Sequence, residues 1–352
     1  MPTITLRLEL HKPTEPKQQM YQQMTEWNTH FANWLLFHPE GNKATSKIFR
    51  EFSKEKFPSA VVNQTIREVK SQKKHQKAKM FRKVWCGFNN QNMRVEKGRK
   101  YYTVSFPTLE KRIGVPIVAQ PFQIKWLDKI IEGTVKQGAA KLYRKKKKWF
   151  LAIAIIWKRE FSPNEKIMGI DLGLRYLAVA SVGTHSLFMK GSPVAYTRRR
   201  HAARRRKLGK AKKLQAIKKS KNKESRWMKE QYHWISRQIV DRAIANGVGV
   251  IRMEDLTDIR NTAKSKRTDQ GRNLHAWSFY QLREYIQYKA EIAGIRLELV
   301  HPEYTSQTCK NGHRAKANRK GLHFCCQECG YRSHADLNGA INIAKAISGL
   351  AA

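Results

Sequence analysis

The feature that most constrains the fold of this chain is a series of short apolar runs that alternate with helical patterns from about residue 165 onward. Two of these runs, residues 167–171 and 250–254, each end in an acid, Asp171 and Glu254 respectively. Short apolar runs bounded by turn residues predict buried strands. Strands that alternate with helices predict an α/β domain that contains parallel strands.

The same region predicts an order of elements. Two strands come first, and helices are expected over residues 227–246 and from 279 to 293, each followed or preceded by a further strand. A polar loop near 257–275 separates the two helices, and a last helix begins at or near Asp336. Strand, strand, helix, strand, helix, strand, insertion and helix is the order of an RNase-H-like domain.

Three acids in this frame are candidate metal ligands: Asp171, Glu254 and Asp336. Carboxylate oxygens are the ligands that Mg²⁺ prefers, and two such ions roughly 3.5–4 Å apart can stabilise both oxygens of a phosphodiester displacement. A single acid at a strand end is usually a cap or a salt-bridge partner, and Asp336 could be only a helix N-cap. Asp255 faces away on an extended strand and is interpreted as a cap. Three acids in this order favour a metal-dependent nuclease.

Four of the five cysteines lie within residues 309–329 and indicate a metal site in a reducing compartment. Cys326 and Cys329 form the second half of a zinc ribbon, whereas the first half offers only Cys309 and, four residues later, His313. The simplest complete site is therefore a structural Cys₃His zinc site made of these four residues.

Other ligand sets stay open from the sequence. Cys325 is an alternative fourth ligand, and His323 and His334 are weaker candidates. A degenerate knuckle that holds no metal is a further alternative. The remaining cysteine, Cys86, is predicted to be a small buried hydrophobic residue.

The charge indicates a polyanionic partner. The chain has 70 Lys+Arg against 27 Asp+Glu, a formal net charge of +43, which favours nucleic acid as the partner. A hydrophobic content of 41% and nine Trp argue against a ribosomal or histone-like protein without substantial cores. Residues 196–223 contain 14 Lys or Arg and no acid, which favours phosphate contacts over a merely solvated helical face. The sequence shows no signal peptide and no membrane-spanning run.

The N-terminal half predicts a split β domain. Residues 1–10 alternate as a strand does, and a helical pattern then extends from about 18 to 84. Strands return at 101–106 and 113–118, and an apolar hairpin follows with a basic turn at 144–148. The early strand and the later strands are expected to share one sheet that the helical segment interrupts.

These motifs resemble the TnpB family of transposon-encoded proteins, which are related to type V CRISPR effectors. The resemblance is specific from Gly169 to Ala346, through GIDLGLRYLAVAS, MEDL, TSQTC, FxCxxCG and DLNGAINIA. It is looser earlier, at FPSAVVNQTIREV and TVSFPTLEKRIGVPI. The chain departs from the family in lacking the second cysteine of the ribbon, and its N-terminal half is short.

The resemblance implies a multidomain α+β protein. The implied domains are a split β-barrel wedge domain (1–12 and 87–160), a helical recognition domain (13–86), a RuvC-like nuclease domain (165–303 and 333–352) and a zinc-ribbon target-nucleic-acid-binding domain (304–332).

The resemblance also implies a function: RNA-guided cleavage of double-stranded DNA beside a short target-adjacent motif, in a mobile element. Asp171, Glu254 and Asp336 are the implied catalytic ligands of two Mg²⁺ ions, with one structural Zn²⁺ in the ribbon and a guide RNA from the element end. A cytoplasmic, nucleoid-associated monomer is expected. The alternatives are a guide-independent RuvC-type nuclease, a guided binder or repressor that does not cleave, and a non-enzymatic zinc accessory to transposition.

Overall fold

The computed structural model describes residues 2–39, 45–74, 80–220, 222–256, 279–301 and 304–346. The chain divides into two compact units, Met1–Lys158 and Arg159–Ala352. Both units mix helices with sheets, so the chain has the mixed α+β fold expected from the sequence. Among the described helices, none combines the length and apolar character needed to cross a membrane.

The first unit is built on a seven-stranded antiparallel sheet with the order β2-β6-β7-β1-β5-β4-β3. Its strands are β1 (Thr3–Leu10), β2 (Gly87–Phe88), β3 (Arg94–Lys97), β4 (Tyr102–Pro107), β5 (Arg112–Val118), β6 (Lys136–Lys145) and β7 (Lys148–Ile156). β1 lies between β5 and β7, with Leu6 opposite Ile153. The predicted sharing of one sheet by the first strand and the later strands is therefore confirmed, as is the hairpin of β6 and β7.

The helices of the first unit come mainly between β1 and β2. They are α1 (Glu15–Phe37), α2 (Phe49–Phe52) and α3 (Ser59–Lys74), with short 3₁₀ turns at Ser46–Ile48 and Asn90–Asn92. Phe31 and Leu35 of α1 pack with Val62 and Ile66 of α3 in one buried cluster, as the apolar spacing predicts. The sequence analysis did not predict α4 (Pro121–Ile131), which begins with a capping box at Gln120.

The second unit is built on a five-stranded mixed sheet with the order β10-β9-β8-β11-β12. Its strands are β8 (Ile167–Asp171), β9 (Tyr176–Val182), β10 (His185–Lys190), β11 (Val250–Glu254) and β12 (Arg296–Val300). β8 pairs in parallel with β11, which pairs in parallel with β12, whereas β8, β9 and β10 are antiparallel. The predicted strands are confirmed, and β10 is an additional strand that the sequence analysis did not identify.

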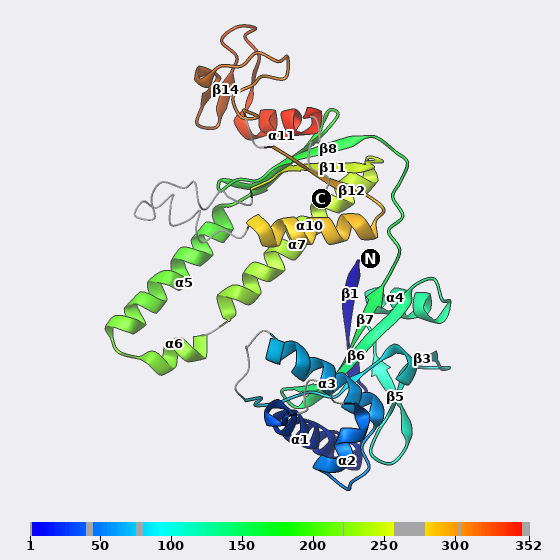
Figure 1. Cartoon of the computed structure of the whole chain (residues 1–352). Coiled ribbons are helices and arrows are strands. Elements are labelled where there is room, and N and C mark those ends of the chain that lie inside the picture. The colour runs from blue at the N-terminus through cyan, green and yellow to red at the C-terminus, as the bar shows by residue number, and fades with distance from the viewer. Residues whose placement is uncertain are drawn as a thin grey trace. The chain divides into compact units, whose positions relative to one another are not determined.

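Helices cover both faces of this sheet (Figure 1). Helices α7 (Lys223–Ala245) and α10 (Phe279–Ile292) contribute Ile235, Ile239, Leu282 and Ile286 to the core against one face. Helix α11 (Ala335–Lys345) packs mainly on β8 and β9 from the other side. The loop predicted near 257–275 lies outside the described residues.

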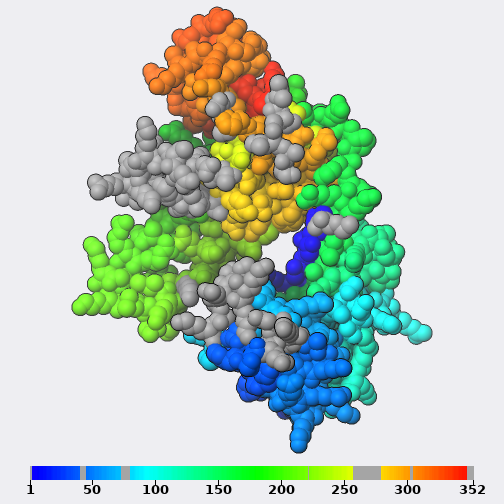
Figure 2. Space-filling model, in the orientation of Figure 1, coloured from blue at the N-terminus to red at the C-terminus, as the bar shows by residue number. Residues whose placement is uncertain are grey.

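A small three-stranded sheet precedes α11. It contains β13 (Arg319–Lys320), β14 (His323–Cys325) and β15 (Arg332–His334), after a 3₁₀ turn at Lys316–Asn318. In Figure 2 this segment is the orange protrusion at one end of the second unit. Because β15 leads directly into α11, the position of this helix depends on the fold of the small sheet.

Candidate metal centres

Two of the three acids meet because their strands are parallel neighbours. Asp171 is the last residue of β8 and Glu254 the last residue of β11, and the register pairs Ile170 with Met253. The carboxyl ends of parallel strands lie at one edge of a sheet, so both carboxylates are held at the same edge. Their side chains are half-buried among apolar core residues of the second unit.

Helix α11 supplies the third acid. Asp336 is the second residue of α11 and is 8% exposed. It is not the N-cap of this helix, because that position belongs to His334, whose Nδ1 accepts a hydrogen bond of 3.3 Å from the Asp336 backbone N–H. The Asp336 side chain instead accepts from Arg319, whose Nη2 donates to Oδ1 over 2.9 Å.

Two glycines allow α11 to approach the sheet closely enough to assemble the site. A Cβ at Gly339 would lie 2.9 Å from Oδ2 of Asp171, so the carboxylate of Asp171 packs directly on the backbone of α11. A Cβ at Gly169 would lie 2.0 Å from the carbonyl oxygen of Ala340. Gly339 is one turn beyond Asp336, and residues three apart share a helix face. Asp171 and Asp336 therefore approach the same region of α11.

The pKa of Asp171 reflects both its burial and its closeness to the other two acids. Burial raises the pKa of Asp171 to about 8, helped by the negative charges of Glu254 and Asp336 and opposed by the positive charge of Arg319. Burial also raises the pKa of Glu254, although a hydrogen bond from the Thr305 hydroxyl and the charge of Arg319 oppose this. One buried and two half-buried acids, with the guanidinium of Arg319 nearby, form a centre that a cation would stabilise.

The donor set fits hard divalent cations such as Mg²⁺. All three side chains offer carboxylate oxygens, the ligands that such cations prefer. Thr305 and Arg319 lie around them and orient Glu254 and Asp336 by hydrogen bonds. The sequence analysis missed both of these residues because each contacts an acid that is distant in the sequence.

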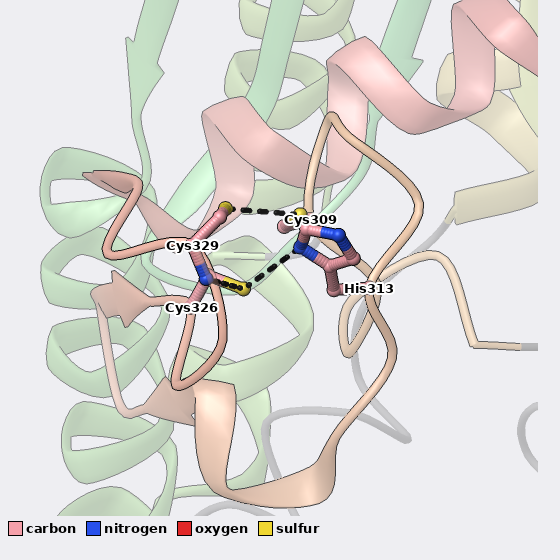
Figure 3. A group of neighbouring side chains, drawn as sticks. All are labelled: Cys309, His313, Cys326 and Cys329. Carbon is pink, nitrogen blue, oxygen red and sulfur yellow. Dashed lines mark hydrogen bonds between the residues drawn. The ribbon is translucent and has the colours of Figure 1, made fainter.

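The second centre is the group of Cys309, His313, Cys326 and Cys329, whose ligand atoms all lie within 4.8 Å of one another (Figure 3). The two Sγ atoms of Cys309 and Cys329 are 3.9 Å apart, and Sγ of Cys326 is 3.6 Å from Nδ1 of His313. Ligands of a tetrahedral zinc ion with bonds of about 2.0–2.3 Å lie about 3.3–3.8 Å apart. The four residues that the sequence predicted as ligands lie close together in the fold, so they could hold zinc.

Local groups favour the thiolate form of Cys329. Hydrogen bonds from the backbone near Tyr331 and from the side chain of Asn311 lower the pKa of Cys329 to about 6, although some burial opposes this. The backbone N–H of Asn311 also points at Sγ of Cys309 over 3.3 Å. Because zinc binds the thiolate form, these donors suit the cluster to a metal.

The alternative ligands of the ribbon lie elsewhere. Cys325 is the last residue of β14 and stands opposite Arg332 of β15, and His323 pairs with His334 in the same small sheet. His334 caps α11 and its ring packs edge-on against Tyr176. None of these three joins the group of four close ligand atoms in the described part of the chain.

Two further predictions concern residues outside these centres. Cys86 is fully buried, and burial raises the pKa of its thiol to about 12, as suits a small hydrophobic residue. Asp255 accepts a hydrogen bond of 3.2 Å from Nη1 of Arg283 on α10. Since α10 and α11 cover opposite faces of the sheet, Asp255 points away from the carboxylate centre, as its place after Glu254 predicts.

The carboxylate edge and the cysteine cluster are joined through α11. Asn342 of α11 donates to the carbonyl oxygen of Thr305 over 2.9 Å, and Asn338 donates to that of Thr308 over 2.7 Å. Thr308 immediately precedes Cys309, and the hydroxyl of Thr305 donates to Glu254. The loop that enters the ribbon is therefore fixed to the helix that carries Asp336.

Two family models match this chain. Residues 153–260 match a family described as probable transposase, OrfB_IS605, and residues 279–343 match the Cas12f1-like TNB domain. The first match covers β8 to β11 and includes Asp171 and Glu254, and the second covers α10, β12, the ribbon and most of α11. The matched segments are those that carry the two candidate metal centres.

Individual relatives agree with these matches. The chain is 33% identical over 67% of its length to the CRISPR-associated endodeoxyribonuclease Cas12f1 of Sulfoacidibacillus thermotolerans, and spans 60% of that protein. It is 26% identical over 70% of its length to a TnpB-like protein of Methanocaldococcus jannaschii, and spans 91% of it. It is 29% identical over 56% of its length to the putative RNA-guided DNA endonuclease InsQ of Escherichia coli, and spans 53% of it.

Solved structures share the fold. The chain of a Cas12f1–sgRNA–target DNA complex matches 94% of this chain and 82% of its own length, with a TM-score of 0.67 at 18% identity. The mini-RNA-guided endonuclease Cas_phi3 matches 97% of this chain with a TM-score of 0.58 at 10% identity. The chain thus shares the mixed α+β fold of these Cas12-type structures. Its family matches and its relatives also make it similar to TnpB-like proteins, as the sequence motifs indicate.

Proposed function

We propose that this chain is an RNA-guided DNA endonuclease that cuts double-stranded DNA beside a short target-adjacent motif. The observation that carries the proposal is the assembly of three carboxylates, Asp171, Glu254 and Asp336, at one edge of the five-stranded sheet. Two relatives, named as an endodeoxyribonuclease and a putative RNA-guided DNA endonuclease, support the same activity.

The proposed chemistry is metal-dependent hydrolysis of a phosphodiester. Two Mg²⁺ ions bound by the three carboxylates would stabilise the charge that develops on the attacking and leaving oxygens. The chain prepares this site by holding Asp171 between two other acids, where its raised pKa reflects the need for a cation. Thr305 orients Glu254 and Arg319 orients Asp336, so neither carboxylate has to be positioned during the reaction.

The proposed domain organisation follows the resemblance. The strand order β10-β9-β8-β11-β12 and the helix α11 on β8 support an RNase-H-like, RuvC-type domain over residues 165–303 and 333–352. The seven-stranded sheet supports a wedge domain over 1–12 and 87–160, with a helical recognition domain over 13–86. The remaining segment, 304–332, is the zinc ribbon that would bind target nucleic acid.

A structural role is proposed for zinc. Cys309, His313, Cys326 and Cys329 would hold one Zn²⁺, and all four protein ligands together leave no open position for a substrate. Because the ribbon is tied to Asp336 through α11, zinc would stabilise the nuclease centre without joining its chemistry.

The large positive charge suits a guided mechanism. A protein that holds a guide RNA, a heteroduplex and a displaced strand must neutralise several backbones while it reads few bases itself. The formal net charge of +43 is spread over both units and is well suited to this work.

The test is to express the protein from its native locus, purify it with its RNA, and sequence that RNA. A single structured species that ends in a variable stretch is expected. The complex is then incubated with Mg²⁺ and plasmids that carry the matching sequence beside randomised flanks, with Asp171→Asn as the matched control. Cutting of matched plasmids by the wild type alone supports the proposal. Cutting without a match would indicate a guide-independent nuclease, and binding without cutting would indicate a repressor.

A further inference from the structure

The basic run of residues 196–223 folds around a cavity. It forms α5 (Ser192–Lys210) and α6 (Leu214–Ser220), and α7 then returns to the sheet (Figure 1). A cavity of about 650 Å³ lies between these three helices and the first turn of α10. The run is therefore more than a uniformly solvated basic face, because part of it forms the wall of a concave site.

The cavity has an apolar floor. Met228 and Tyr232 of α7 are buried, at 5% and 0% exposure, and form part of its lining together with Ile217 of α6. The imidazole of His201 on α5 is a further lining group and is half-buried. An imidazole ring and apolar side chains can contact the face of a planar ring such as a nucleic-acid base.

The rim of the cavity is cationic. Arg198, Arg204, Arg205 and Lys218 line it, and Glu224 is its one acid among the described lining residues. Glu224 forms an ion pair with Arg205, and Nη2 of Arg198 donates to the hydroxyl of Tyr232 over 3.3 Å.

Arg204 and Lys218 differ from their neighbours on the rim. Within the part of the chain that the structure describes, neither forms an ion pair with an acid. Two uncompensated cations therefore remain at the mouth of a cavity with an apolar floor.

We propose that this cavity, the α5–α7 cleft, binds one unpaired nucleotide of a single-stranded nucleic acid. The base lies on the floor near Met228 and His201, and the flanking phosphates contact Arg204 and Lys218. A volume of about 650 Å³ is within the range of roughly 300–1,000 Å³ that is usual for small-ligand sites. In a duplex, stacked pairs keep the base faces covered, so only an unpaired base can contact the floor. The cleft thus adds a contact to a base face, which goes beyond the proposed endonuclease activity.

Binding of short oligonucleotides to the full chain tests the proposal without a guide or a cleavage step. The protein carries Asp171→Asn, is freed of nucleic acid at high salt, and is titrated with fluorescein-labelled dT₁₂, rU₁₂ and an abasic 12-mer. The pocket variant is Arg204→Gln with Lys218→Gln. The control is Arg206→Gln with Lys219→Gln, which removes the same charge from exposed neighbouring positions on the same helices outside the cleft.

We expect the pocket variant to bind dT₁₂ or rU₁₂ roughly tenfold more weakly than the control variant. The slope of its salt dependence should fall by about 0.7 for each phosphate that the variant no longer neutralises. Equal weakening in both variants would mean that the positive charge acts diffusely, and would overturn the proposal. RNA and DNA offer the same kinds of contact, a base face and phosphates. A preference for rU₁₂ or for dT₁₂ therefore shows whether an RNA or a DNA strand uses the cleft.

A second variant tests the base contact and leaves every charge in place. Ser225→Ile puts a branched aliphatic side chain, which fills space without offering a ring to stack on, at an exposed position in the lining of the cleft. It should weaken binding of the base-carrying 12-mers several-fold and leave the abasic 12-mer unaffected. Unchanged binding of the base-carrying oligonucleotides would refute the base-binding role. Thermal melting of each variant establishes that it is folded. If the cleft variants bind oligonucleotides normally while guided cleavage is observed, the base-binding role is refuted and the proposed endonuclease function is unaffected.

Discussion

Helix α11 packs so closely on β8 that only a glycine fits at position 169, and Gly169→Ala tests this close packing. A methyl group at this position would lie 2.0 Å from the carbonyl oxygen of Ala340 and 2.6 Å from the amide nitrogen of Ala344. Both atoms belong to the backbone of α11, so no side-chain rotation can relieve the contact. Ordinary contact begins at 3.4 Å, so α11 has to move by about 1.4 Å, the difference between 3.4 and 2.0.

The displacement affects both stability and activity. Overpacking a core usually costs about 1–3 kcal/mol, and a backbone clash belongs at the upper end of this range. Asp336 moves with α11, and a misplacement of about 1 Å can lower a catalysed rate by 10²-fold. We therefore expect Gly169→Ala to lose about 2–3 kcal/mol in the free energy of unfolding and at least about 100-fold in the rate of target cleavage.

The assay pairs chemical denaturation with single-turnover cleavage of a matched target by the purified complex. Gly209→Ala is the control, because Gly209 lies in α5 with an ordinary backbone conformation, and a methyl group added there would have nothing within 4 Å. This variant should be neutral or more stable by about 0.5–1 kcal/mol. Wild-type stability and cleavage in Gly169→Ala would refute the close packing of α11 on β8.

Three further predictions follow from other contacts. Asp171→Asn should abolish cleavage while guided DNA binding, measured by gel shift, stays within about twofold of the wild type; retained cleavage would remove Asp171 from the site. Cys329→Ser should lower the zinc content and the melting temperature, whereas Cys325→Ser should leave both unchanged, and equal zinc content in the two variants would contradict the assigned ligands. Burial lowers the pKa of Lys289 to about 8, so its folded form binds fewer protons than the unfolded chain between about pH 8 and 10.5, and stability should rise with pH there. Denaturation of wild type and Lys289→Met as a function of pH isolates this contribution, and parallel curves would exclude it.

The sequence predicts the frame of the second unit better than its closest contacts. Asp171 and Glu254 could be found because each ends an apolar run, and such runs are local in the sequence. The cysteine pair and His313 could be found by spacing in the same way. The C-x-x-C spacing to Cys329 favoured Cys326 over its neighbour Cys325, whereas the convergence of the four ligand atoms needed the structure.

What the sequence could not predict depends on long-range packing. Gly169 is required only because α11, which comes much later in the chain, crosses β8 at that point, and no local pattern encodes such a crossing. The roles of Thr305 and Arg319 likewise depend on long-range packing, because each contacts an acid that only the fold brings close. β10 was missed because most of its residues are exposed and only Met189 is buried, so it lacks the apolar run that predicts a buried strand. The domain boundaries and the metal occupancy remain predictions.

The central position of β1 has a consequence for synthesis of the chain. Its neighbours β5 and β7 end at Val118 and Ile156, so β1 is made well before either of the strands with which it pairs. At about 5–20 residues per second, roughly 8–30 s pass before β7 has been made. During that interval the edge of β1 that later pairs with β7 is unpaired, and such an edge can pair with another chain. Synthesis therefore allows the β1–β5 edge to close before the β1–β7 edge.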